Sequence, residues 1–298
     1  MINLKKQKGA MYTAEISRKN PGDILLLLDL SSSMNEPFGG DPEQKKKAKQ
    51  LADVINERFL LETITWCTKE GPIRHYFDLG IIGYRTDEKG TPLVESVFTQ
   101  EPLKGKELIP IDEIYKNPLR FEERIEEKEG EKIVKKMPIW FDPIAEGGTP
   151  MCEALRRAAG IVDAWVKEHP KSFPPIVINV TDGMPTDDPD EENFSTVVKE
   201  AERLKGISTE DGNTLLFNLH ISSQPGSPVL FPNSDEGLPD KYARMLFQIS
   251  SILPESMINF GKSSGMELNP NARGFVFNGD MDSVYKMIDI GTRVHKLA

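Results

Sequence analysis

The chain has 298 residues, which suffices for one large α/β domain or for two small ones. Apolar residues make up 38% of it and charged residues 28%, proportions typical of a globular protein and not of a disordered one. The formal net charge of −10 argues against nucleic acid and against an anionic membrane as partners.

The N-terminal third is predicted to hold a central strand, a helix and a hairpin. Residues 24–30 (ILLLLDL) are apolar at nearly every position, which is typical of a parallel strand covered by helices on both faces. Residues 44–66 repeat apolar side chains at helical spacing, and the basic cluster at 45–47 is expected to start this helix in solvent. Residues 76–84 and 93–98 are predicted to be strands on either side of a turn.

Residues 99–140 interrupt this pattern. They contain four prolines and a charged run, and their apolar residues are too sparse for an independent core. We therefore predict an insertion that carries a polar hairpin or a short helix. It would belong to a single domain over residues 1–298, with the core at about 22–295.

The rest of the chain alternates helices and strands. In chain order, the predicted elements are a helix over 150–169, a strand over 174–180, a helix over 193–205, a strand over 214–221, a helix over 242–253, a strand over 274–278, and a closing helix to about 294 that Asp280 or Asp282 can cap. Such alternation predicts the α/β class. The expected fold is a doubly wound, mostly parallel six-stranded sheet with one antiparallel edge strand, flanked by helices in a Rossmann-like arrangement.

Polar residues stand where the predicted parallel strands end, the edge at which such folds bind ligands. Asp29, Ser31 and Ser33 follow the first strand, Thr149 follows the insertion, and Asp182 follows the strand at 174–180. Together they offer two carboxylates and three hydroxyls, without thiolate or imidazole. Mg²⁺ is therefore the ion expected to bind there, with Ca²⁺ or Mn²⁺ as alternatives. We expect Asp29 and Ser31 to lie on surface loops.

These five residues, with the flanking strings GGTPMCEAL and VTDGMPT, resemble the metal-ion-dependent adhesion site of von Willebrand factor A domains over about residues 22–295. The resemblance implies that Ser31 and Ser33 bind a divalent ion directly. It implies that Thr149, Asp29 and Asp182 bind it directly or through water, and that a partner's acidic side chain takes a remaining position. One departure is Ser32, where the family usually has glycine.

Other patterns favour structural roles. The haloacid-dehalogenase pattern needs a second acidic residue where Ser31 stands, which argues against phosphatase chemistry. Residues 261–265 match G-x-S-x-G but follow a helical segment, so a loop is expected there instead of a nucleophile elbow. His220 is expected to be a satisfied buried histidine. The acidic string at 187–192 is expected to be a solvated loop that favours the next helix N-terminus, or alternatively to repel anionic partners.

The expected function is a Mg²⁺-dependent protein–protein interaction module, not an enzyme, whose partner presents an acidic residue. Strings such as LLFNLHISS resemble stand-alone bacterial proteins of the tellurite-resistance and stress-response type, which implies a partner in kinase and phosphatase signalling or in defence. Alternatives are an adaptor for an AAA+ ATPase of the chelatase or MoxR type and, less favoured, a metal-dependent hydrolase. Nothing in the residues separates the first two.

The expected location is cytoplasmic, without membrane contact. The N-terminal residues lack the apolar stretch of a signal peptide, and no run approaches the ~18 apolar residues of a membrane span. Cys67 and Cys152 lie among apolar neighbours in predicted helices, which favours reduced core thiols over a disulfide.

Overall fold

The computed structural model describes residues 12–39, 43–68, 71–128, 131–223 and 226–292. Its strands are β1 (Gly22–Asp29), β2 (Phe77–Thr86), β3 (Pro92–Ser96), β4 (Ile109–Pro110), β5 (Arg120–Lys128), β6 (Glu131–Ile139), β7 (Ile176–Thr181), β8 (Leu215–His220), β9 (Val229–Leu230) and β10 (Phe275–Phe277). Its helices are η1 (Ser32–Asn35), α1 (Lys47–Val54), η2 (Ile55–Leu60), α2 (Leu61–Trp66), α3 (Ile111–Lys116), α4 (Met151–Glu168), α5 (Ser195–Lys205), α6 (Lys241–Ile249), α7 (Glu255–Ser263) and α8 (Met281–Thr292).

The main sheet has the strand order β3-β2-β1-β7-β8-β10-β9, and β4 also pairs with β2. The five inner strands from β2 to β10 run parallel, whereas β3, β4 and β9 are antiparallel to their neighbours. The predicted fold class, a doubly wound and mostly parallel α/β sheet, is confirmed. The sheet has eight strands instead of six because β4 and β9, at two residues each, are too short to leave a periodic pattern.

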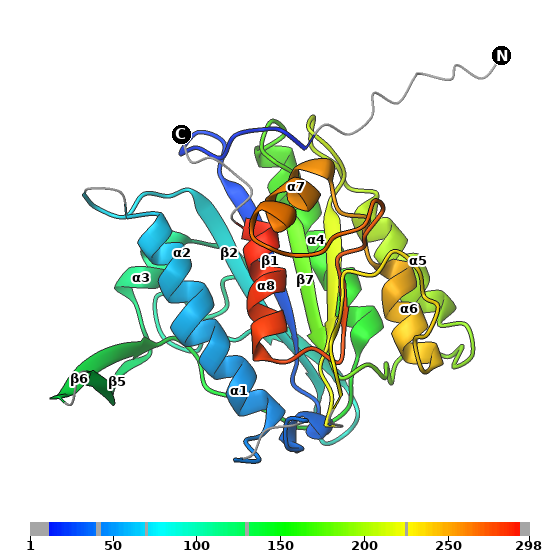
Figure 1. Ribbon diagram of the computed structural model, residues 1–298, viewed down its shortest axis with the longest axis horizontal. Helices are drawn as coiled ribbons and strands as arrows, with labels where there is room; N and C mark the ends of the chain where they lie inside the picture. The colour runs from blue at the N-terminus through cyan, green and yellow to red at the C-terminus, as the bar shows by residue number, and fades with distance from the viewer. Residues whose placement is uncertain (1–11, 40–42, 69–70, 129–130, 224–225, 293–298) are drawn as a thin grey trace.

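The apolar run of β1 explains why helices lie on both faces of the sheet. Ile24, Leu26 and Leu28 belong to one core, together with α1, α2 and α8, whereas Leu25 and Leu27 belong to a second core with α4, α5 and α6. Successive side chains of a strand point to opposite faces, so a strand that is apolar at every position needs both layers. Figure 1 shows the two helical layers enclosing the sheet.

The helix predicted over 44–66 consists of three consecutive segments, and the middle one, η2, has π-helical geometry. Asn56 lies in η2 and is buried. Its amide group donates to the Phe141 carbonyl at 3.0 Å and accepts from the Trp140 backbone N–H at 2.9 Å. The Asn56 side chain thus makes two hydrogen bonds to the backbone at the end of the 99–140 segment. Asn56 lies where the helix has the wider π-helical turn.

Residues 99–140 hold β4, α3 and a separate two-stranded sheet formed by β5 and β6. The β5–β6 hairpin projects from the side of the molecule near α1 and α2 (Figure 1). Arg124 on β5 forms ion pairs with Glu57 and, at 3.6 Å, with Asp53. The Trp140 indole N–H donates to the Ile114 carbonyl at 2.7 Å, which links the end of the hairpin to α3.

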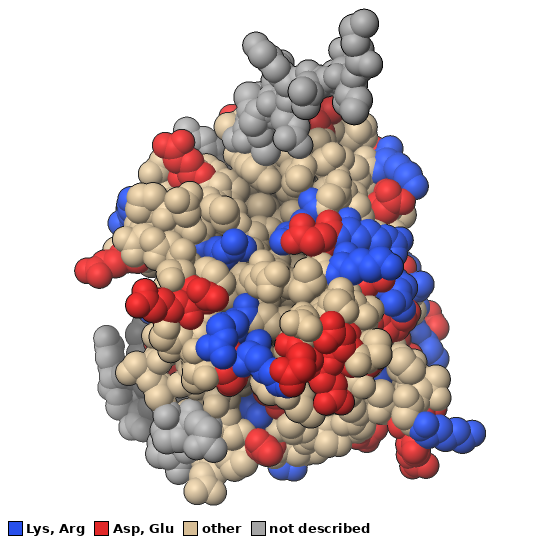
Figure 2. Space-filling model, turned by 90° about the vertical axis from the view of Figure 1, so that its right-hand side faces the viewer, with Lys and Arg blue, Asp and Glu red and all other residues tan. Residues whose placement is uncertain are grey.

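Cys67 and Cys152 are both free and buried. Burial raises the pKa of the Cys67 thiol to about 12 and also raises the pKa of Cys152, so neither is a reactive thiolate at neutral pH. In the described part of the chain, no helix is long and apolar enough to cross a membrane. On the face turned to the viewer in Figure 2, basic and acidic side chains are interspersed and form no broad surface of one sign among the described residues.

At the end of the sheet where β1 and β2 begin, Asp23 is buried next to another carboxylate. Asp23 pairs in register with Asp78, and neither oxygen of Asp23 has a hydrogen-bond partner among the described residues. Asp78 in contrast is bonded to His75 Nε2 at 2.6 Å and to the Trp165 indole N–H at 2.9 Å. Burial, and then the charge of Asp78, raise the pKa of Asp23 well above its usual value.

We expect Asp23→Asn to stabilise the protein at neutral pH. The folded state holds the Asp23 proton more tightly than the unfolded chain does, so stability falls as pH rises from the ordinary carboxyl pKa toward the raised one. Removing this charge, and giving Asp78 an amide donor, should raise the free energy of unfolding by roughly 1–3 kcal/mol. Urea unfolding at neutral and acidic pH should show the gain shrinking in acid. The exposed Asp163→Asn is the control, and unchanged or lower stability of Asp23→Asn at neutral pH would contradict the expectation.

Candidate metal centre

The predicted site residues meet at the carboxyl end of β1 and β7, two adjacent central strands. The chain leaves β1 toward α1 and leaves β7 toward α5, which lie on opposite faces of the sheet. This divergence creates a topological switch point, the place where open α/β sheets have room for a ligand. Ser31, Ser33, Thr149 and Asp182 line one cleft of about 490 Å³ there. Asp29 lies beneath it.

Asp29 is the last residue of β1 and is fully buried, so the expectation that Asp29 and Ser31 lie on surface loops is wrong. One oxygen of Asp29 accepts from the Ser31 backbone N–H at 2.9 Å, and the other accepts from the Thr181 hydroxyl at 2.8 Å. Burial, followed by the charge of Asp182, raises the pKa of Asp29 to about 6, against the lowering effect of these hydrogen bonds. The buried Asp29 carboxylate therefore fixes the position of the loop that follows β1.

The hydroxyl oxygens of Ser31 and Ser33 are 3.0 Å apart at the start of η1. Between them, Ser32 is exposed, and its backbone N–H donates to the Gly147 carbonyl at 2.9 Å. The serine that distinguishes this loop from the motif it resembles is therefore accommodated, because its side chain is exposed to solvent. Gly147 itself has a φ of +70°, and a Cβ there would collide with the Thr86 carbonyl.

Thr149 is held by the loop that follows β7. Its backbone N–H donates to the Thr186 hydroxyl at 2.9 Å, and the Thr186 backbone N–H donates back to the Thr149 carbonyl at 2.9 Å. These reciprocal bonds join the loop before α4 to the loop that carries Asp182. Three loops that are far apart in the sequence are thus tied together by backbone hydrogen bonds.

Lys47 is the site residue that sequence reasoning missed. Its side chain is only 2% exposed, and its ammonium group lies 2.9 Å from one oxygen of Asp182 and 3.6 Å from Glu36. The expectation of a solvated start to this helix is therefore wrong for Lys47, although Lys45 is about half exposed. Its position depends on an antiparallel bridge between Pro37 and Lys46, a pairing that local sequence patterns do not encode.

His220, at the end of β8, also lines the cleft. Its Nδ1 accepts from the Asn278 backbone N–H at 3.2 Å, and its ring stacks on Phe277 with 4.6 Å between centroids. Burial lowers the pKa of His220, so its imidazole ring is uncharged near neutral pH where it lines the cleft. The prediction of a satisfied histidine agrees with the bond to Nδ1, although the ring is only partly buried.

The donor chemistry fits a hard divalent cation. Every candidate ligand is an oxygen, and in the described residues no group of three or more histidine, cysteine, aspartate or glutamate side chains could hold a metal ion. The two carboxylates are close enough for Asp182 to raise the pKa of Asp29, so added positive charge would relieve their repulsion. A soft or imidazole-preferring metal would find no suitable ligands in such a set.

The acidic string at 187–192 caps two helices. The Asp187 carboxylate accepts from the backbone N–H groups of Cys152 and Glu153 at the start of α4, both at 3.0 Å. Asp188 accepts from the Val197 N–H at 2.8 Å in the first turn of α5. The expected role at the next helix N-terminus is thus observed for Asp188, but this residue is buried, so the expectation of a solvated loop is wrong there.

Residues 261–265 do not form a nucleophile elbow. Helix α7 continues through Ser263, whose hydroxyl donates to the Phe260 carbonyl at 2.7 Å. The expected loop is therefore partly wrong, since it begins only after Ser263. A nucleophile elbow needs a strand before its serine, whereas a helix precedes Ser263 here, as the sequence indicated.

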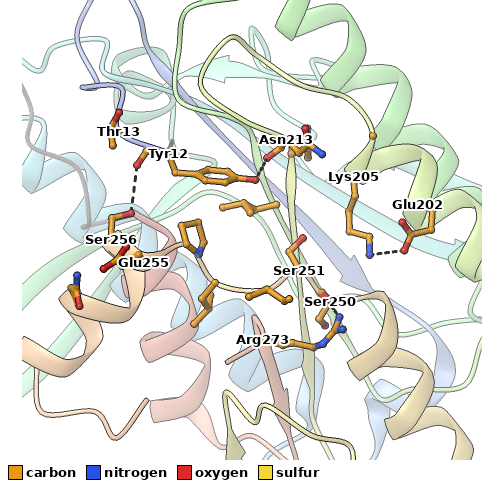
Figure 3. A pocket seen from close by; sticks show the side chains of 17 residues that line it. Tyr12, Thr13, Glu202, Lys205, Asn213, Ser250, Ser251, Glu255, Ser256 and Arg273 are labelled. Carbon is orange, nitrogen blue, oxygen red and sulfur yellow. Dashed lines mark hydrogen bonds and ion pairs between the residues drawn. The ribbon is translucent and has the colours of Figure 1, made fainter. Parts of the chain in front are cut away.

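A larger hollow, about 780 Å³, lies beside the start of β8 (Figure 3). It is at the opposite end of the sheet from the cleft, which lies at the carboxyl ends of β1 and β7. Three of the hollow's polar side chains already have partners in the protein, whereas the buried Thr214 hydroxyl has none among the described residues. Lys205 pairs with Glu202 at 2.7 Å, the Tyr12 hydroxyl donates to the Asn213 carbonyl at 3.1 Å, and Arg273 donates to the Ser250 carbonyl at 2.6 Å. The cleft at β1 and β7 is therefore the better candidate for function.

Comparison with known proteins leaves the family open. No protein-family profile and no curated protein matches the sequence. Among solved structures, the chain is similar to manganese-loaded TRAP protein of Plasmodium vivax (TM-score 0.41, 14% identity, covering 91% of this chain and 72% of that one). It is also similar to proximal thread matrix protein 1 of the mussel byssus (0.42, 16%, 80% and 43%) and to the human COPII-coat protein Sec24c (0.32, 13%, 67% and 26%). At these scores the matches carry no argument about function.

We expect Asp187→Ala to destabilise the fold by about 1–2 kcal/mol, because it removes the cap from two N–H groups of α4. Urea unfolding measures the loss. Glu191→Ala, in the same acidic string, serves as the control and should change the free energy of unfolding by less than about 0.5 kcal/mol. Equal effects of the two substitutions would show that Asp187 acts only through general surface charge.

Proposed function

We propose that this protein is a divalent-metal-dependent protein-interaction module of the von Willebrand factor A type, and that it is not an enzyme. The observation that carries the proposal is the convergence of Ser31, Ser33, Thr149 and Asp182 on one cleft above the buried Asp29. These are the five positions that the sequence motif predicts. The preferred ion is Mg²⁺, with Mn²⁺ or Ca²⁺ as substitutes.

In this proposal, Ser31, Ser33 and Thr149 offer neutral oxygens to the ion, whereas Asp182 offers a negative one. Asp29 orients Ser31 through the backbone bond and lies fully buried beneath the cleft. The bound ion supplies residual positive charge that attracts a carboxylate. The surrounding loops leave the cleft open to solvent, so that a partner's acidic side chain can reach it. His220, the histidine among the described residues that line the cleft, uses its Nδ1 lone pair to accept from the Asn278 backbone N–H, so its neutral ring carries the proton on Nε2 and does not serve as a general base.

We expect Ser33→Ala to weaken Mg²⁺ binding at least about ten-fold, because it deletes an oxygen donor without disturbing the bonds of Asp29. Ser32→Ala is a matched control: it is the adjacent serine, but its side chain faces solvent, so metal affinity should stay unchanged. Isothermal titration calorimetry with Mg²⁺ and with Mn²⁺ measures both. Wild-type protein that binds neither ion, or equal affinities for the two variants, would contradict the assignment.

The proposed partner is a protein that presents a glutamate or aspartate to the ion, in a bacterial signalling, stress-response or defence system. Co-purification of partners should therefore depend on Mg²⁺ and be lost in EDTA. We expect Asp182→Asn to abolish the same interactions, since it removes the negative ligand while nearly preserving shape. Partners that are retained equally in Mg²⁺, in EDTA and by Asp182→Asn would exclude this mode of recognition.

A further inference from the structure

Lys47 occupies an unusual place for a lysine. It is the first residue of α1, where a positive charge has the wrong sign for the helix dipole, and the first turn of α1 holds no acidic residue. Its side chain is nearly fully buried, and burying an ammonium group is costly unless it is paired. The stabilisation of Lys47 must therefore come from the carboxylates that it meets, not from the helix.

The backbone fixes Lys47 in that place. Its N–H donates to the Glu36 carbonyl at 3.0 Å, directly after the bridge between Pro37 and Lys46. The segment that follows Ser31 and Ser33 thus folds back onto the start of α1 and delivers the lysine into the cleft. Among the described residues, Glu36, whose side chain is 58% exposed, and the partly exposed Asp182 are the carboxylates that pair with the ammonium group.

This arrangement alters the charge that a metal ion would meet. Asp29 and Asp182 together would neutralise a divalent ion. Lys47 adds a positive charge 2.9 Å from Asp182, and Glu36, at 3.6 Å and 58% exposed, offsets that charge only in part because solvent screens it, so a surplus of positive charge remains when the ion binds. That surplus lowers the affinity for the divalent ion when no anionic ligand is bound. An anionic ligand that binds in the cleft neutralises the surplus charge.

We propose that Lys47 is a tethered cation of the metal site, which makes binding of the divalent ion and of a carboxylate ligand cooperative. Lys47 weakens binding of the ion when no carboxylate is present. The carboxylate restores affinity for the ion, and by thermodynamic linkage the ion raises affinity for the carboxylate by the same factor. The inference rests on the proposed function and assigns to Lys47 the regulation of that site.

The test is Mg²⁺ affinity by calorimetry, measured in chloride and in acetate at equal ionic strength. In chloride, we expect Lys47→Met to bind Mg²⁺ about ten-fold or more tightly than the wild type, since a nearby repelling charge is removed. In acetate, the wild type should gain affinity for Mg²⁺, and Lys47→Met should gain less. Lys45→Met is the matched control, because it removes the same charge from an exposed lysine at the same helix start.

Different results separate the two proposals. If the wild type binds no Mg²⁺ in either salt, the metal site itself is refuted, and the role of Lys47 with it. If the wild type binds Mg²⁺ but Lys47→Met binds it no more tightly than Lys45→Met, only the role of Lys47 is refuted. Should Lys47→Met not fold, Lys47→Gln keeps an N–H donor for Asp182. The wild-type comparison of acetate with chloride stands independently, and equal Mg²⁺ affinities in the two salts would overturn the cooperativity.

Discussion

The repulsion between Asp29 and Asp182 is the constraint on which the carboxyl end of the sheet depends. Asp29 ends β1 and Asp182 directly follows the adjacent parallel strand β7, and Asp29 is wholly buried. The Thr181 hydroxyl and the Ser31 N–H satisfy Asp29, whereas the Lys47 ammonium satisfies Asp182. Each carboxylate thus has its own partner, and the Ser31 and Ser33 hydroxyls, 3.0 Å from each other, line the cleft above the buried Asp29.

The loops around these two carboxylates are joined to one another by hydrogen bonds. Gly147 accepts from Ser32, and Thr149 exchanges two bonds with Thr186. Asp187 then ties the same loop to the first turn of α4. Because these bonds connect segments that are distant in sequence, the site is assembled only when the whole sheet is formed, and its donors need little rearrangement afterwards.

The sequence was sufficient for those features that are encoded locally. The unbroken apolar run of β1 predicts a central parallel strand, and the oxygen donors stand directly after predicted strands. It was insufficient where long-range pairing decides the environment. Lys47 lies in a basic cluster that resembles a solvated helix start, and only the return of the chain at Pro37 buries it. Asp23 likewise lies in a strand whose pattern gives no hint of a carboxylate opposite it. Strands of two residues, such as β4 and β9, carry no periodicity to detect.

The π-helical turn at Asn56 has a consequence for the inserted segment at residues 99–140. The widened turn coincides with the residue that bonds the backbone on both sides of the Trp140–Phe141 peptide, where the chain returns from residues 99–140. Without the Trp140 N–H and the Phe141 carbonyl beside it, Asn56 would have no backbone groups of this segment to bond, and an ordinary α-helical turn would suffice. The π turn is therefore coupled structurally to the return of the chain from residues 99–140.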